Sequence, residues 1–303
     1  MTARAASHVL LIEPVQFRPN IETAASNVFQ HSVDESQVAA LASKALDQHR
    51  ALRDLLVENG VQVTVVRSRA DTPDASFCNN WFSTHAGGPG AGSTLVLYPL
   101  LAPNRRIERR PDIVALLRQR YPTVVDFSDR ERSGSYLEST GSLCLDDTAH
   151  VAYAALSPRT HRSLAEEWAA RLGYRLVAFQ ATDGAGTPYY HTNVMMFIGH
   201  GLAGVCLESI GPERDLVRGS LEASGLEVLP ISRDQVLAFC GNCLPLVNDL
   251  GEPVLVMSTA AYQGFRPDQR TRIESHARIL HTDLSAFELI GGGSARCLLG
   301  ELF

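Results

Sequence analysis

The chain has 303 residues, of which 45% are hydrophobic and 20% charged, as in globular domains that bury a sizeable core. Its formal net charge of −6 argues against nucleic acid as the main partner, because a basic surface is needed to displace the counterions of phosphates. The 27 basic residues comprise 26 arginines and one lysine, Lys44. This excludes most chemistries that need a pocket lysine, such as pyridoxal Schiff bases and phosphate-binding P-loops.

The sequence also bears on whether the protein is inserted into a membrane or secreted. No apolar run is long enough to span a bilayer, so we expect no membrane partner. The apolar segment near the N-terminus is too short for the core of a signal peptide, and we expect a cytoplasmic protein. Six cysteines in a chain of this length are too sparse for a disulfide scaffold, which agrees with that compartment.

Strands and helices alternate along the chain. Residues 9–12 have the apolar pattern of a buried strand, residues 35–59 the periodicity of an amphipathic helix, and residues 61–66 that of a second strand. Gly60 stands where a glycine that ends the helix is expected. The same order recurs with helices at 111–121, 161–172 and 212–223 and strands at 124–125, 176–177 and 228–229.

Further strand-like runs lie between these passages, and small or amide residues open each of them. The runs are 95–98, 143–145 with 151–155, 194–198 with 203–207, 244–247 with 254–257, and 297–302. The openings are Asn79-Asn80, Thr140-Gly141, Thr192-Asn193, Gly241-Asn242 and Gly292-Gly293. Their second residues are 61, 52, 49 and 51 positions apart (80 to 141, 193, 242 and 293).

A repeat of this period predicts an array or propeller-like assembly. Five units would average about sixty residues, which is enough for a ββαβ unit. No proline- or serine-rich linker interrupts the series, so we expect one α/β domain over residues 1–303. A plain mixed α/β sheet is the alternative.

The motif Cys240-Gly241-Asn242-Cys243 has the spacing of a redox pair or of half a zinc site. No second cysteine or histidine pair completes a zinc site, so we expect no metal. The motif also follows a helix and precedes a strand, the reverse of a thioredoxin-like dithiol. We favour small residues at a repeat boundary.

Three residues able to do chemistry share one position in different units. Cys297 follows the glycine-rich turn 291–293, and His191 and Glu138 each stand at the opening of another unit. Equivalent positions of a closed pseudosymmetric array meet near its axis, so we expect the three to converge. A cysteine, a histidine and a carboxylate suit covalent catalysis. Each also has a structural alternative, namely a core thiol, a structural histidine or the partner of an arginine.

Four ordered motifs resemble the amidinotransferase (guanidino-group-modifying) superfamily, and among its branches most closely the citrulline-utilisation hydrolases. They are residues 77–83, Leu137-Glu138-Ser139-Thr140-Gly141-Ser142, Tyr190-His191-Thr192-Asn193-Val194 and residues 291–297. The resemblance covers nearly the whole chain. It implies a fivefold pseudosymmetric, pentein-like α/β-propeller with Cys297 as nucleophile, His191 as general acid/base, Glu138 as the carboxylate and no cofactor. A non-catalytic translation factor shares that fold, so the fold alone does not establish the activity.

Two departures from the family pattern bear on the substrate. Arginine deiminases of the superfamily bind the guanidinium with two aspartates, and the matching residues here are Asn80 and Asn193. Carboxylates suit a cation that has only donors, whereas an asparagine offers the donor and the acceptor that a neutral ureido group requires. We therefore expect a ureido amino acid such as citrulline. Ser139 also replaces a more usual glycine, a change with little consequence for this expectation.

The implied reaction converts citrulline to ornithine, ammonia and carbon dioxide through a thioester on Cys297. We expect the turn with Gly293 and Ser294, or an asparagine amide, to stabilise the oxyanion. Arginine suits the substrate carboxylate because of its bidentate geometry. Arg159 matches a carboxylate-binding arginine of the deiminases. Arg105 or Arg109 is the second choice, unless residues 105–110 form a solvated face.

Two other functions stay open. One is an arginine deiminase or dimethylarginine hydrolase that acts on a guanidinium, and the other is a non-catalytic binding protein with the same fold. In each case we expect a small amino acid as the ligand, and a homo-oligomer is compatible with the sequence. Three remaining thiols lie in or beside apolar runs and are expected to be core residues: Cys78, Cys144 and Cys206.

Overall fold

The computed structural model of the chain describes residues 5–87 and 92–303. Five three-stranded sheets form within these residues. In four of them an antiparallel pair of strands leads through a helix into a third strand that runs parallel to the second. This is the expected ββαβ unit. The α/β class is confirmed, whereas the propeller-like arrangement of the five units stays a prediction.

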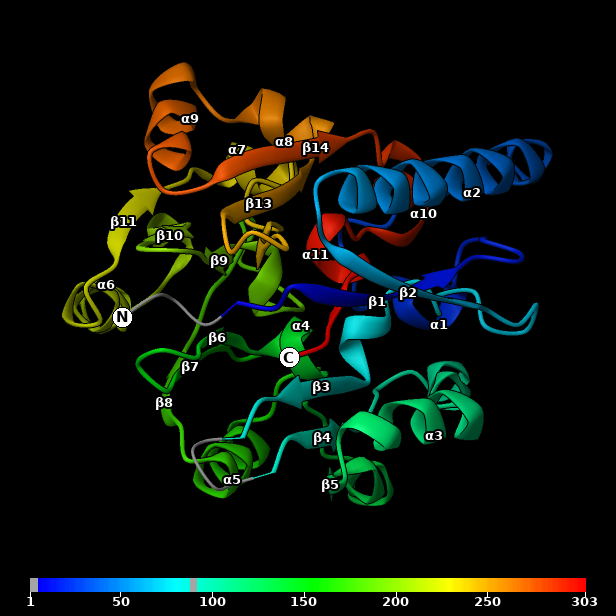
Figure 1. Cartoon of the computed structure of the whole chain (residues 1–303), viewed down its shortest axis with the longest axis horizontal. Helices are drawn as coiled ribbons and strands as arrows, with labels where there is room; N and C mark the ends of the chain where they lie inside the picture. Colours follow the sequence, from blue (N-terminus) through cyan, green and yellow to red (C-terminus); the bar gives the residue numbers. More distant parts are fainter. Residues whose placement is uncertain (1–4, 88–91) are drawn as a thin grey trace.

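Each of these four sheets is a continuous stretch of the chain. Their elements are β3 Phe82–His85, β4 Thr94–Leu97, α3 Pro111–Arg120 and β5 Thr123–Asp126; β6 Cys144–Asp146, β7 Val151–Ala155, α5 Arg162–Leu172 and β8 Arg175–Phe179; β9 Met196–Ile198, β10 Leu202–Val205, α6 Arg214–Ala223 and β11 Glu227–Pro230; and β12 Leu244–Val247, β13 Pro253–Ser258, α8 Thr259–Gly264, α9 Pro267–Glu274 and β14 Arg278–Thr282. The helices lie toward the outside of the molecule in Figure 1.

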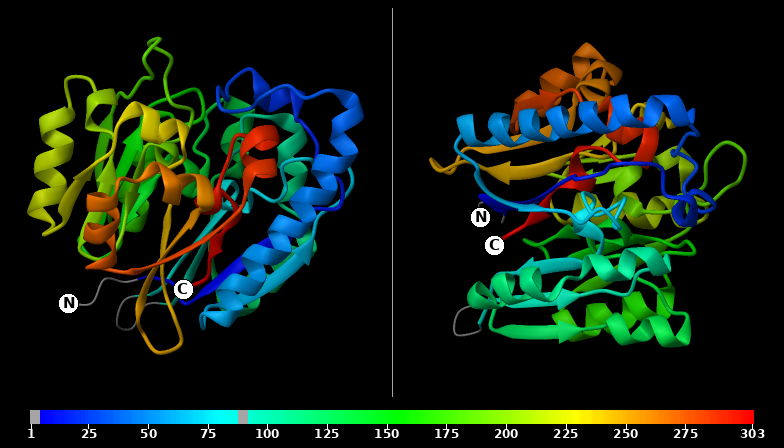
Figure 2. Two further views of the ribbon diagram at one scale, coloured as in Figure 1. Left: turned by 90° about the horizontal axis from the view of Figure 1, so that it is seen from above. Right: turned by 90° about the vertical axis from the view of Figure 1, so that its right-hand side faces the viewer.

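The remaining sheet joins the two ends of the chain. Strand β1 His8–Glu13 pairs in parallel with β2 Gln62–Arg67 after the long helix α2 Glu35–Glu58, and antiparallel with the last strand β15 Gly300–Glu301. Both views of Figure 2 place α2 along the outer side of these strands. There Leu52 and Leu56 belong to one buried cluster with Val9 and Leu11. The pairing of β1 with β15 brings the C-terminal segment into the middle of the molecule (Figure 1).

The expected strand 297–302 is wrong in its first half. Residues Ala295–Leu298 form a short helix, α11, and only Gly300–Glu301 is a strand. Three of the expected strand openings are likewise single helical turns: η1 Cys78–Asn80, α4 Ser139–Ser142 and η4 Thr192–Val194. A run of small and apolar residues does not distinguish a turn of helix from a strand, which is why the sequence pattern failed here. Additional short elements connect the units: α1 Ile21–Ala24, η2 Pro103–Glu108, η3 Ser128–Ser133, η5 Leu207–Ser209, α7 Arg233–Leu237 and α10 Ser285–Gly291.

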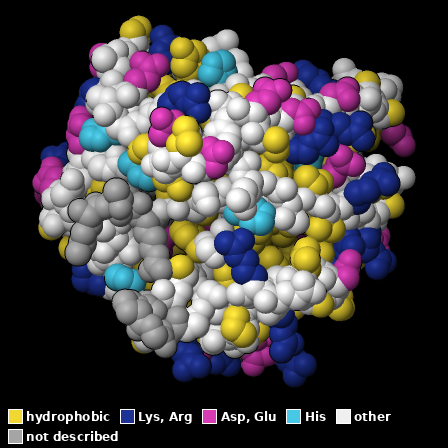
Figure 3. Space-filling model, in the orientation of Figure 1, with side chains coloured by type: hydrophobic (Ala, Val, Ile, Leu, Met, Phe, Trp, Pro, Cys, Tyr) yellow, Lys and Arg dark blue, Asp and Glu magenta, His cyan; other side chains and the backbone are white. Residues whose placement is uncertain are grey.

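The surface is mixed in charge. Arginines and acidic side chains lie mainly around the rim of the face in Figure 3, and no basic stripe crosses the part drawn in colour. Lys44 is half-exposed, and its Nζ lies 3.6 Å from Asp283 Oδ2, which agrees with the solvated helix face of an ordinary surface lysine. Among the described residues, no helix is both long and apolar enough to cross a membrane.

Candidate active site

Short helical turns near the middle of the molecule bring the expected residues together. Segment η1 contacts α4 and α11, and α4 also contacts η4. Because each turn directly precedes or adjoins a strand of a different sheet, side chains from separate units reach one small cavity. Its lining is Thr23, Asn27, Asp74, Phe77, Asn80, Arg105, Arg159, Tyr190, His191, Gly291, Gly293 and Cys297.

Glu138 and His191 form a buried pair. His191 Nε2 lies 2.8 Å from Glu138 Oε2, and each side chain is 1% exposed. The other carboxylate oxygen accepts the N–H of Leu101 at 3.0 Å, and Arg159 Nη1 lies 3.4 Å from Oε2. Burial alone would raise the pKa of Glu138, but the Arg159 guanidinium and the hydrogen bond from His191 hold it well below its ordinary value. Glu138 is therefore an ionised acceptor in the protein interior.

This carboxylate determines the tautomer of His191. An ionised carboxylate only accepts hydrogen bonds, so Nε2 carries the proton and Nδ1 keeps a lone pair. Burial lowers the pKa of His191 to about 4, although Glu138 acts in the opposite direction, and the ring is neutral at pH 7. Nδ1 is buried and has no hydrogen-bond partner among the described residues. A neutral imidazole with a free lone pair is suited to general-base chemistry.

Two asparagine amides surround the sulfur of Cys297. Nδ2 of Asn242 donates to Sγ at 3.2 Å, and Nδ2 of Asn193 lies 3.7 Å from it. Burial raises the pKa of the Cys297 thiol, against the hydrogen bond from Asn242, so the thiol is protonated at pH 7. Its own N–H already donates to the carbonyl of Ser294 at 3.0 Å. The side-chain amides are thus the donors closest to the reactive atom.

Two residues of the turn α4 are constrained by their surroundings, Gly141 by close contacts and Ser139 by its backbone conformation. A Cβ on Gly141 would lie 2.6 Å from Asn80 Nδ2 and 2.8 Å from His191 Nδ1, so only glycine fits between them. Ser139 has φ +47°, in the left-handed region that favours glycine, and its hydroxyl donates to the Phe82 carbonyl at 2.7 Å. The residue that replaces the family's glycine therefore keeps a glycine-like backbone.

Arg105 is one of two arginines in the cavity wall. Its guanidinium is 2% exposed, makes two hydrogen bonds of 2.9 Å to Glu108 and donates to Asn80 Oδ1 at 2.8 Å. Arg105 thus orients the Asn80 amide. Arg109 lies outside the lining and pairs with Glu131 at 2.7 Å. The helical turn η2 ends at Glu108, which separates the two arginines of this run.

Arg159 is the other arginine in the wall. Its Nη2 donates to Ser26 Oγ at 2.7 Å and to the Thr23 carbonyl at 3.1 Å, and its guanidinium carbon lies 5.0 Å from the centre of the Tyr190 ring. Arg159 therefore links the segment 23–26 to the Glu138 carboxylate.

The predicted oxyanion turn stays a prediction. Burial raises the pKa of the Cys297 thiol, and a backbone hydrogen bond at Ser294 lowers it against this effect. Gly293 lines the cavity, whereas Ser294 does not, and the Ser294 hydroxyl donates to Glu288 at 2.7 Å. Ser294 thus fixes the end of helix α10 relative to the turn.

Cys240 and Cys243 lie outside this cavity. Each thiol donates to a backbone carbonyl at 3.4 Å, that of Ala261 for Cys240 and that of Cys240 for Cys243. Burial raises the pKa of Cys240 to about 12 and that of Cys243 well above its ordinary value. Their hydrogen bonds to backbone carbonyls and their position outside the lining of the cavity favour a structural role.

Two residues of the site were missed in the sequence. Asn242 is the donor nearest to Cys297, and the repeat places it 49 residues after Asn193 (242 minus 193), which was the signal available. Asp74 is a buried carboxylate in the cavity wall, where it accepts hydrogen bonds from Asn20 at 2.7 Å and Thr23 at 3.1 Å. No local pattern marks Asp74.

The chain is similar to known hydrolases of amino-acid guanidino groups. The family model of the eukaryotic N,N dimethylarginine dimethylhydrolases matches residues 13–303. No curated protein matches the sequence significantly. The expected resemblance to the amidinotransferase superfamily is confirmed by this match.

Solved structures agree in fold. The N-terminal domain of ArgZ, an arginine dihydrolase from cyanobacteria solved with its substrate, matches with a TM-score of 0.76 and 16% identity over 97% of both chains. AgrE in complex with L-arginine matches with a TM-score of 0.76 and 17% identity over 99% of this chain and 40% of its own. A dimethylarginine dimethylaminohydrolase adduct matches with a TM-score of 0.66 and 16% identity over 98% of this chain and all of its own. At these identities the likeness concerns the fold.

Substitution of Gly141 by alanine should reduce activity without unfolding the protein. The new methyl group would displace both Asn80 and His191, and a misplacement of about 1 Å costs on the order of a hundredfold in rate. Steady-state kinetics and thermal unfolding of Gly141→Ala measure the two effects. Unchanged turnover would contradict the assigned geometry. Gly219→Ala, whose added Cβ would meet no atom within 4 Å and whose φ is not positive, is the control for a glycine-to-alanine change.

Alkylation of Cys297 should depend on pH as expected for a neutral thiol. Its pKa is raised from 9.0, so the thiol is protonated below that pH and reacts faster as the pH rises through a midpoint above 9. The measurement is the rate of iodoacetamide labelling by intact mass, with Cys297→Ala to identify the site. A rate that is already maximal at pH 7 would indicate a preformed thiolate–imidazolium pair instead.

Proposed function

We propose that this protein hydrolyses the side chain of a small ureido amino acid. The chain belongs to the N,N dimethylarginine dimethylhydrolase family of C–N hydrolases, which is the basis for a hydrolytic activity. The substrate that we favour is citrulline, converted to ornithine, ammonia and carbon dioxide through a thioester on Cys297. The observation that carries this choice is the set of neutral amides around the reactive sulfur.

Asn193 and Asn242 contact Cys297 Sγ, and Asn80 lies in the same cavity wall. Glu138, the nearby carboxylate, already has Arg159 and His191 as partners. A guanidinium placed beside the sulfur would lose its hydration and gain no unpaired carboxylate, at a cost of several kcal/mol. A ureido group is neutral and can pair its carbonyl and N–H groups with these amides.

The charged groups of the cavity suit the other end of an amino acid. Asp74 can pair with an α-ammonium group, and Arg105 and Arg159 can bind an α-carboxylate. Arg159 would exchange its bond to Ser26 for one to the substrate. This orientation directs the side chain of the amino acid toward Cys297.

The mechanism uses His191 and Cys297, which are both neutral and both line the first cavity. His191 Nδ1 removes the thiol proton as sulfur attacks the ureido carbon, and Glu138 stabilises the imidazolium that forms. The amides of Asn193 and Asn242 stabilise the oxyanion. His191 then protonates the departing ammonia and activates water for hydrolysis of the thioester. The resulting carbamate releases carbon dioxide.

The organisation of the chain fits one catalytic unit. The cavity residues run from Thr23 to Cys297, and we propose that residues 1–303 form a single catalytic domain whose five sheets are the units of a pentein-like propeller. All six cysteines are buried and unpaired, which suits a reducing compartment such as the cytoplasm.

Hydrolysis of a guanidinium is the second candidate. The family and the arginine-bound AgrE and substrate-bound ArgZ structures favour it, and so does the carboxylate of Asp74, which lies 3.9 Å from Arg105 in the same cavity. In such a mode the cation would have to share the site with Asn80 and Asn193. The two candidates differ in the product expected from each substrate.

Assays of purified protein should detect ornithine from citrulline faster than citrulline from arginine or methylarginines. The measurement is ammonia release together with chromatography of the amino-acid products. Cys297→Ala should abolish turnover by removing the nucleophile while leaving the unfolding temperature close to that of the parent protein. Citrulline formed from arginine at an equal or higher rate would overturn the citrulline assignment, and no turnover of any of these compounds would favour a binding protein.

Replacing the amides by carboxylates should shift the preference toward a cationic substrate. In Asn80→Asp the ratio of kcat/KM for arginine to that for citrulline should rise at least about tenfold, because the new carboxylate attracts a cationic side chain. A tenfold change corresponds to about 1.4 kcal/mol. Asn59→Asp adds the same charge at a part-buried residue outside the cavity, where the side chain donates to the Leu55 carbonyl, and should leave the ratio unchanged. Equal ratios in both variants would exclude Asn80 as a selector of substrate charge.

A further inference from the structure

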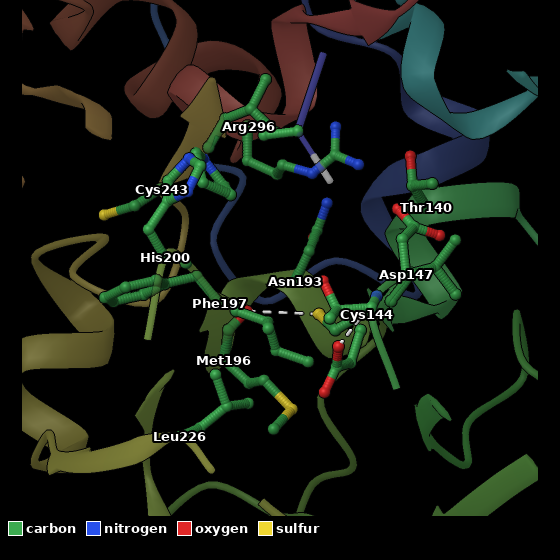
Figure 4. A pocket seen from close by; sticks show the side chains of 18 of the residues that line it. Thr140, Cys144, Asp147, Asn193, Met196, Phe197, His200, Leu226, Cys243 and Arg296 are labelled. Carbon is green, nitrogen blue, oxygen red and sulfur yellow. Dashed lines mark hydrogen bonds between the residues drawn. The ribbon is translucent and has the colours of Figure 1, made fainter. Parts of the chain in front are cut away.

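A second cavity lies behind the proposed active site. It has a volume of about 400 Å³ and shares no lining residue with the first cavity. Polar and apolar side chains from separate segments of the chain line it in Figure 4, among them Thr140, Asn193, Met196, Leu226 and Arg296.

Residues adjacent in the sequence line the two cavities at several places. Cys297 belongs to the first cavity and its neighbour Arg296 to the second. Asn242 bonds the Cys297 sulfur, and the adjacent Cys243 lines the second cavity. Asn193 itself lines the second cavity and lies 3.7 Å from the same sulfur. Asn193 is thus part of the boundary between the two cavities.

The proposed reaction needs a route for small molecules on this side. When ammonia leaves citrulline, the amino acid stays attached to Cys297 and fills the entrance cavity. Ammonia must depart, and one water molecule must arrive, while that entrance is blocked. The first cavity is small, and its lining includes Thr23, Asn27 and Tyr190, so we expect a bound amino acid to fill it.

We propose that the second cavity receives the ammonia released from the substrate and supplies the water that hydrolyses the thioester. This inference rests on the proposed function. Asp146 contributes a carboxylate to the lining of this cavity: it is 5% exposed, and its Oδ2 is buried without a hydrogen-bond partner among the described residues. Its Oδ1 accepts the N–H groups of Thr148 and Ala149, which fixes the carboxylate. An unpartnered carboxylate oxygen suits ammonium or water.

The proposed hydrolysis of citrulline proceeds in two steps, each of which balances in atoms. In the first, a C–S bond forms between Cys297 and the ureido carbon, the terminal C–N bond breaks, and the thiol proton leaves with ammonia through His191. In the second, water adds to the thioester carbon, the C–S bond breaks, and the thiol regains a proton. The carbamate product then divides into ornithine and carbon dioxide.

The test fills the cavity from a position distant from the catalytic residues. Leu226 is partly buried and lines the second cavity, and Leu226→Trp adds bulk there. We expect the rate of acylation of Cys297 to be unchanged and kcat to fall about tenfold, because the exchange of ammonia for water follows acylation. Acid quenching during steady state and intact-mass analysis should then detect an accumulated adduct on Cys297 that retains the amino acid.

Two variants serve as controls. Leu237→Trp places the same residue at a position that is 66% exposed and lines neither cavity, and Leu226→Ala enlarges the second cavity. Both should keep the parent kcat. Asp146→Asn retains the shape but removes the charge, and it should raise the ammonium chloride concentration that halves turnover.

The outcomes separate this inference from the function on which it rests. Parent kinetics in Leu226→Trp, or an adduct that has already lost the amino acid, would overturn the exit route while citrulline hydrolysis stands. If the parent protein converts arginine and not citrulline, the same measurement with arginine tests the route, since ammonia again leaves first. An unmodified protein that turns over neither compound would overturn both proposals.

Discussion

The buried negative charge of Glu138 is the constraint on which the site depends. An unmatched carboxylate in the interior costs several kcal/mol, so its partners must stay in place. These partners come from distant parts of the chain: the Leu101 N–H, the His191 ring and the Arg159 guanidinium. Arg159 in turn holds Ser26. The charge of Glu138 thereby fixes the tautomer of His191 and, through Arg159, the position of Ser26.

The scarcity of lysine acquires a partial explanation from the buried ion pairs. Three arginines lie in the walls of the cavities, and each has a glutamate partner: Arg105 with Glu108, Arg159 with Glu138, and Arg296 with Glu301. A planar guanidinium can bond a carboxylate and several carbonyls at once, which an ammonium group cannot do with the same geometry. Exposed pairs such as that of Arg266 with Asp268 contribute little, and they do not account for the arginine excess.

The sequence pattern predicted the units and much of the site, because the repeat spacing is local information. It marked the positions of Asn80, Gly141 and Asn193, and the structure brings them to one centre. Asn242 carried the same signal, but it was interpreted only as one of the small residues at a repeat boundary. Asp74 and Ser26 were beyond reach, since their importance arises only from contacts across the fold.

Arg109 illustrates a different limit. A run of basic residues does not reveal which side chain points inward, because a tight helical turn such as η2 reorients successive residues strongly. Arg105 is buried by its contacts with Glu108 and Asn80, while Arg109, one residue past the end of η2, faces Glu131. The partner carboxylates therefore determine which arginine side chain lies in the cavity wall.

The distribution of charge along the cavity argues for a substrate with distinct ends. Asp74, Arg105 and Arg159 carry charges of both signs, as the ammonium and carboxylate groups of an amino acid require. The sulfur of Cys297, by contrast, is bordered by the amides of Asn193 and Asn242. His191 and the thiol are both neutral at rest, and the ionised Glu138 is already paired with Arg159. A zwitterionic head group with a neutral side chain matches this pattern at both ends.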